Sequence, residues 1–97
     1  MLEKGRIMDI SKAKQLFEKN ELMLSQEILN KLIIRNPGDI DSLLLRGRIN
    51  SKMQNWGDAM NDFAAVLEFD PANSDAKTGF EMVNNILGYF TPDMFNP

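Results

Sequence analysis

The sequence contains neither cysteine nor histidine. Thiolate and imidazole metal ligands, disulfides, the commonest general base and the usual activators of a nucleophile are therefore all absent together. Few kinds of catalytic or metal-binding chemistry therefore remain available to the chain. We expect a protein without catalytic residues, a metal site or a cofactor.

Long apolar runs and concentrated basic charge are missing as well. The formal charge is −3, from 11 basic and 14 acidic residues that are interspersed, so no basic stripe could follow a phosphate backbone. No stretch approaches the roughly 20 apolar residues of a membrane span, and the first residues lack the apolar core of a signal peptide. We expect a soluble, cytoplasmic protein that binds neither nucleic acid nor membrane.

What the chain does contain is an internal repeat. The segment LNKLIIRNPGDID, which begins at Leu29, aligns with FAAVLEFDPANSD, which begins at Phe63, at a shift of 34 residues. Pro37 thereby aligns with Pro71. Internal periods of this length are typical of stacked helical units. A chain of 97 residues has room for one domain only, and we divide residues 1–97 into a repeat at 6–39, a repeat at 40–73, and a capping helix with a tail at 74–97.

Apolar residues within each unit have helical spacing. Trp56, Met60 and Phe63 follow one another at i, i+4 and i+7, and no window alternates convincingly with a period of two. A proline after the second helix of each unit prevents that helix from continuing. We expect Asp39, Asn55 and Asn73 as N-caps. The pattern predicts an all-α protein with helices near residues 7–19, 22–35, 40–53, 56–69 and 74–88.

The segment LLLRGRINSKMQNWGDAMNDFAAVLEFDP, residues 43–71, resembles the tetratricopeptide repeat. Gly47 and Ala59 stand at small positions of that family, where paired helices cross closely, so leucine at either position should force the pair apart. Arg46 and Asn50 depart from the pattern, since leucine and tyrosine are usual there. The resemblance implies a right-handed α-solenoid of two helical hairpins and a capping helix.

The resemblance also implies a noncatalytic module that binds a peptide or helix of another protein in a concave groove. The positions that would face this groove are Ile10, Lys14, Phe17, Leu44, Arg48, Lys52, Thr78 and Met82. The apolar members would contact the partner, and the cations would meet acidic groups. Alternatively, the apolar members are core residues and the cations form a solvated face. The clamp by which some family members grip a chain terminus is not expected, because Leu45, Asp75 and Gly79 replace its polar residues.

Other polar residues are interpreted structurally. Asp58 and Asp62 share a helix face, but without a recognisable third group we interpret them as solvated rather than as an acid–base pair. The segment DPANSD, residues 70–75, lacks the central glycine and distal glutamate of a calcium loop and is interpreted as a turn. Trp56 is interpreted as a structural aromatic rather than a stacking platform.

The chain ends in GYFTPDMFNP, which begins at Gly88. We expect Gly88 to end the last helix, and Met82 and Ile86 to leave apolar surface at the open end of the solenoid. A small core needs that end covered. We predict an intramolecular lid formed by Tyr89, Phe90, Met94 and Phe95. The alternatives are a tail that binds a partner, or a self-associating structural protein, a monomer or weak homo-oligomer, in which the last helix and tail of one copy cover another.

Overall fold

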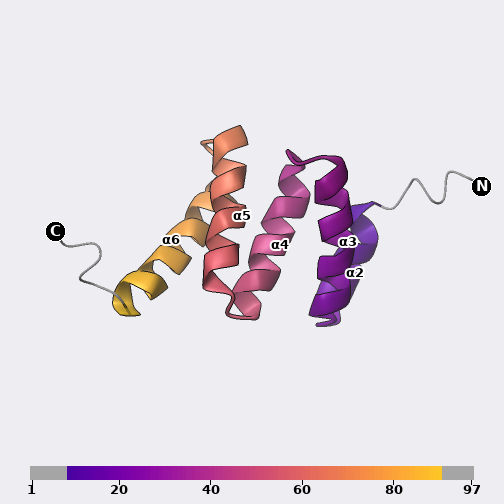
Figure 1. Ribbon diagram of the computed structural model, residues 1–97, viewed down its shortest axis with the longest axis horizontal. Coiled ribbons are helices and arrows are strands. Elements are labelled where there is room, and N and C mark those ends of the chain that lie inside the picture. The colour runs from indigo at the N-terminus through magenta and orange to yellow at the C-terminus, as the bar shows by residue number, and fades with distance from the viewer. Residues whose placement is uncertain (1–8, 91–97) are drawn as a thin grey trace, which may run out of the picture.

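The computed structural model describes residues 9–90, with side chains as far as Gly88. These residues form five helices joined by short turns (Figure 1). The helices are α2 (Ile10–Glu18), α3 (Leu22–Arg35), α4 (Ile40–Lys52), α5 (Trp56–Phe69) and α6 (Ser74–Phe90). The predicted all-α fold of five helices is confirmed. No described helix is long and apolar enough to cross a membrane.

Each helix packs against the next one in the chain, and α4 additionally contacts α2 and α6. The zigzag course of the chain places α3 in front of α2, with α4 and α5 following along the long axis (Figure 1). Helices α2, α4 and α6 thereby form one side of the molecule, and α3 and α5 the other. This two-sided arrangement positions the candidate site described below.

The 34-residue repeat is visible in the backbone. Asn20 and Gln54, which are 34 residues apart, have φ angles of 64° and 62° and are the only non-glycine residues between 9 and 90 with positive φ. After each of them, the next residue donates its backbone N–H to a carbonyl five residues earlier, at 2.8 Å. This bond is typical of a helix end that closes through a left-handed residue. The same turn therefore joins the helices of both hairpins.

All three residues predicted as N-caps occupy the N-cap position, but only two of them cap with a side chain. Asp39 accepts a hydrogen bond from the backbone N–H of Ser42 at 3.3 Å, and Asn73 Oδ1 accepts one from Ala76 at 2.9 Å. Asn55 precedes α5 as predicted, but its side chain makes no capping bond. Its repeat equivalent Glu21 makes none either. The tight turn, rather than a side chain, sets the start of both second helices.

The start and the end of the helical array differ slightly from the prediction. Helix α2 begins at Ile10, where the Asp9 carboxylate accepts a hydrogen bond from Ser11. The prediction that Gly88 ends the last helix is wrong, since α6 continues to Phe90 and no described glycine has positive φ. The predicted lid of residues 89–97 lies outside the described side chains and stays a prediction.

The outer side of α6 is polar. Lys77, Glu81, Asn84 and Asn85 are exposed, as is typical of the last helix of a repeat array. Ile86 is only partly exposed, and Met82 lines the groove described below. Met82, which is 44% exposed, thus leaves apolar surface on α6 as expected, and Ile86 leaves less.

The core depends on one aromatic ring held between two glycines. Phe63 of α5 is 2% exposed and lies against Gly47 of α4 and Gly79 of α6. A Cβ atom added at Gly47 would lie 2.8 Å from Phe63 Cε1, and one added at Gly79 would lie 2.6 Å from Cζ. The ring cannot retreat from one added methyl group without approaching the other helix. The close approach predicted at Gly47 is confirmed, and Gly79 supplies the opposite side.

Substitution of Gly79 by alanine tests this packing. We expect Gly79→Ala to lower the free energy of unfolding by about 1–3 kcal/mol through overpacking, measured by urea denaturation. The matched control is Gly57→Ala in α5, where an added Cβ meets nothing within 4 Å, and no loss is expected there. Equal stabilities of the two variants would contradict the proposed role of the ring.

Candidate binding groove

A groove of about 760 Å³ lies chiefly between α4 and α6, and α2 and α5 contribute to its lining. A smaller hollow of about 320 Å³ adjoins it between α2 and α4. Six of the residues predicted from the sequence line the larger groove, namely Phe17, Leu44, Arg48, Lys52, Thr78 and Met82. They come together because Leu44 and Arg48 on α4, and Thr78 and Met82 on α6, are spaced one helical turn apart. Their role in binding stays a prediction.

The other two predicted residues lie elsewhere. Lys14 is exposed and lines the smaller hollow. Ile10 packs against the core cluster that contains Ala13 and Leu29 and lines neither space. For Ile10, the alternative interpretation as a core residue therefore describes the contacts better.

Two apolar residues of the groove also belong to the core. Phe17 packs against the core cluster of α2, α3 and α4, and Leu44 packs against the clusters that contain Val66 and Phe63. The two interpretations of these side chains are thus compatible. A residue that is held by the core on one side can present its other side to a ligand without further loss of conformational freedom.

Sequence reasoning missed the contribution of α5 to the groove. Trp56 and Phe63 line it, although the repeat pattern assigns the groove to the first helix of each pair. Gly79 also lines the groove, and the absence of a side chain there lets the Phe63 ring, which is 2% exposed, pack directly against α6 beneath the groove. Trp56 also packs against the cluster of Ala59, Phe63 and Val83, which confirms its structural role.

The groove holds two cations beside one aromatic ring. Lys52 Nζ lies 5.2 Å from the centroid of the Phe17 ring, and Arg48 Cζ lies 5.7 Å from it. Both cations are exposed, and neither forms an ion pair with any of the described residues. Cation–π contacts at exposed sites contribute about 0.5–1 kcal/mol each. They hold two like charges close together at the edge of an apolar groove.

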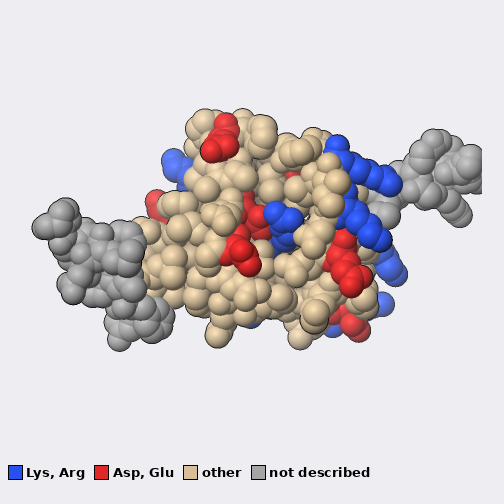
Figure 2. Space-filling model, viewed as in Figure 1, with Lys and Arg blue, Asp and Glu red and all other residues tan. Residues whose placement is uncertain are grey.

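A second polar cluster lies on the side of α3 and α5. Asp62 is 4% exposed, and both of its carboxylate oxygens accept hydrogen bonds from the Arg46 guanidinium, the shortest at 2.7 Å. Asn50 donates to Asp62 at 3.0 Å and accepts from Gln26 at 2.9 Å. Arg46 also donates to Asn30 at 2.9 Å. Figure 2 shows basic and acidic side chains adjoining in the middle of this face.

This cluster corrects the interpretation of Asp62 as a solvated residue. Asp58 is exposed as expected, but Asp62 is buried because Arg46 and Asn50 approach it from α4. Both residues stand at positions where the sequence departs from the repeat pattern. Every buried side-chain nitrogen and oxygen among the described residues has a hydrogen-bond partner, so the cluster is fully paired.

The segment 70–75 forms the turn before α6 and the first two residues of that helix, in agreement with its interpretation as turn and cap. Asn73 donates to Asp70 at 3.2 Å and caps α6 with its other amide atom. Among the described residues, no group of three or more acidic side chains could hold a metal ion. Leu45, one of the positions that argue against the chain-terminus clamp, is buried in the core.

Five helices packed in consecutive pairs around such a groove define an α-helical repeat protein. The fold is that of the tetratricopeptide repeat. The structure matches the crystal structure of a tetratricopeptide repeat protein from Parabacteroides merdae with a TM-score of 0.71 and 25% sequence identity. The match covers 86% of this chain and 38% of that protein.

The sequence is also similar to a second kind of protein. It is 31% identical, over 64 residues, to the cytochrome c-type biogenesis protein CcmH of Escherichia coli and of Shigella flexneri. The similarity covers 59% of this chain, which spans about 18% of the length of these curated relatives. No protein-family model matches the chain.

The buried carboxylate can be tested against a matched neighbour. We expect Asp62→Asn to lower the free energy of unfolding by about 2–4 kcal/mol, because the Arg46 guanidinium loses its anionic partner in a largely buried site. Asp58→Asn makes the same chemical change one turn earlier on α5 and should lower the free energy of unfolding by less than about 1 kcal/mol. Urea denaturation measures both. Similar losses in the two variants would show that burial of Asp62 has no energetic consequence.

Proposed function

We propose that this protein is a noncatalytic protein-interaction module, which binds a segment of a partner protein in the groove between α4 and α6. The observation that carries the proposal is the combination of an apolar floor with two cations at its edge that form no ion pair with residues 9–88. A groove of about 760 Å³ is as large as a typical small-molecule pocket of roughly 300–1,000 Å³, so it has room for a few side chains of a partner. The tetratricopeptide-repeat fold favours a protein partner.

The side chains of the groove suit a peptide. Met82 is 44% exposed, and a flexible thioether adapts to varied apolar surfaces. Trp56 and Phe17 add rigid aromatic surface, of the kind that supplies much of the binding energy at protein interfaces. The Phe17 ring also orders Arg48 and Lys52 before a partner arrives, which lowers the entropic cost of binding.

The groove does not support a reaction. The Ser51 hydroxyl donates to the Gly47 carbonyl at 3.0 Å, and no base among the described residues activates it. Thr78 and Asp75 are exposed. Self-association through the last helix and tail, the alternative function, stays a prediction. The oligomeric state and the expected cytoplasmic location stay predictions.

Charge reversal in the groove tests the proposal. We expect the double variant R48E/K52E to recover at least tenfold less partner protein from an extract of the source cells, because carboxylates would replace the cations that meet the partner. The loss of two weak cation–π contacts should leave the helical circular dichroism intact. Quantitative mass spectrometry of the captured proteins measures the recovery.

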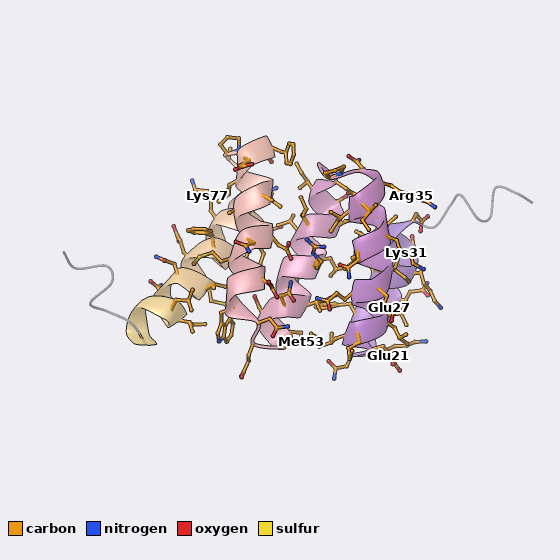
Figure 3. The ribbon with its side chains drawn as sticks, viewed as in Figure 1. Glu21, Glu27, Lys31, Arg35, Met53 and Lys77 are labelled. Carbon is orange, nitrogen blue, oxygen red and sulfur yellow. The ribbon has the colours of Figure 1, made fainter. Side chains whose placement is uncertain are left out.

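The matched control is K31E/R35E. Lys31 and Arg35 are exposed cations one turn apart on α3 (Figure 3), so the control makes the same change in net charge with the same spacing. It should retain the partner. If the groove variant retains the partner as well as the control does, the groove is not the binding surface.

A further inference from the structure

The charges of the groove are arranged in order along α4. Asp41 lines the smaller hollow, Leu44 and Arg48 line both spaces, and Lys52 lines the larger one. These residues are spaced three or four positions apart, so they follow one side of the helix from its first turn to its last. The surface therefore changes from acidic, through apolar, to basic along the helix axis.

Helix α6 places a second carboxylate at the acidic end of this surface. Asp75 is 34 residues from Asp41, lies in the first turn of α6 and lines both hollows. Both carboxylates are exposed, and neither forms an ion pair with a described residue. Lys14 and Glu18 of α2 also line the smaller hollow, but their opposite charges offset one another. The net polarity of the groove thus comes from two carboxylates at one end and two cations at the other.

The distance between the two ends limits what can fit. Asp41 and Lys52 are eleven residues apart on α4, which corresponds to about 16 Å at 1.5 Å per residue. An extended chain covers this distance with about five residues. A helix needs about eleven residues for the same distance, and an isolated helix of that length is only marginally stable in water. Ordering about five residues costs less conformational entropy than ordering about eleven. The lower ordering cost favours an extended segment.

We propose, on the basis of the function proposed above, that the groove selects an extended segment with an acidic and a basic residue about five positions apart and apolar side chains between them. The acidic side chain lies between Arg48 and Lys52, where it relieves the repulsion between these two cations. The apolar side chains lie over Leu44 and Met82. The basic side chain lies at the acidic end, and charge complementarity fixes the direction of the segment.

Synthetic nine-residue peptides test this inference with the full-length protein. One set carries a glutamate and a lysine five positions apart around leucines, in both orders, because the backbone can run either way. A second set has the same composition with the charges two positions apart, and further peptides carry glutamates only or lysines only. Trp56 is the single tryptophan of the chain and lines the groove, so its fluorescence reports binding. We expect at least one peptide of the first set to bind tenfold or more tightly than all the others.

A thermodynamic cycle assigns the acidic residue to its site. Replacing glutamate by glutamine in the best peptide should weaken binding to the wild type at least tenfold, but should have less than a threefold effect on binding to R48Q/K52Q. The control K31Q/R35Q should behave as the wild type does. The loss of affinity caused by replacing the glutamate of the peptide should also diminish at high salt, because exposed charges are screened.

The outcomes separate the two proposals. If peptides bind in the groove regardless of the number and spacing of their charges, the selectivity inferred here is wrong, whereas the proposed function stands. If no peptide binds at about 1 mM while R48E/K52E still loses its protein partner, the inference is again wrong and the groove takes a different kind of surface. If R48E/K52E also retains its partner, both proposals fail.

Discussion

The structure depends on α4, which is the one described helix that packs against all four others. Different sides of α4 make different contacts. Gly47 admits the Phe63 ring of α5, and Arg46 holds a carboxylate of α5 and an amide of α3. The opposite side, through Leu44 and Arg48, lines the groove. The helices on either side of α4 are therefore positioned relative to one another mainly through this one helix.

The two kinds of contact made by α4 have different energetic characters. The contact between Phe63 and the two glycines is apolar and sterically demanding, so it fixes the separation of α4 and α6 and with it the width of the groove. The polar cluster on the other side connects α3 with α5 through Arg46 and Asn50. A buried charge pair adds little net stability compared with apolar packing, but it strongly disfavours any arrangement that separates its partners. The packing of Phe63 thus sets the distance between α4 and α6. The pair of Arg46 and Asp62 disfavours arrangements in which α4 and α5 separate.

Most of the fold could be predicted from the sequence because its signals are local. Helical spacing and the prolines after each pair involve residues close in the chain, and the 34-residue shift is visible without knowledge of any contact. Four of the five helix starts were predicted as observed. The cluster around Asp62 was missed because its members come from three helices, α3, α4 and α5. The unusual residues at Arg46 and Asn50 were a signal, but only the folded structure shows that they share a partner. The groove residues of α4 and α6 followed from the repeat, whereas the contributions of Trp56 and Phe63 required the actual separation of the helices.

The central position of α4 also affects the order in which the molecule can open. The pair α2 and α3 has no contact with the pair α5 and α6, so either end can detach while the other remains folded on α4. The groove, however, includes Phe17 of α2 and Met82 of α6. A ligand that contacts both residues would join two segments that are otherwise connected through α4, and would convert a chain of separable units into one cooperative unit. Such a ligand would also make the two ends of the molecule unfold together.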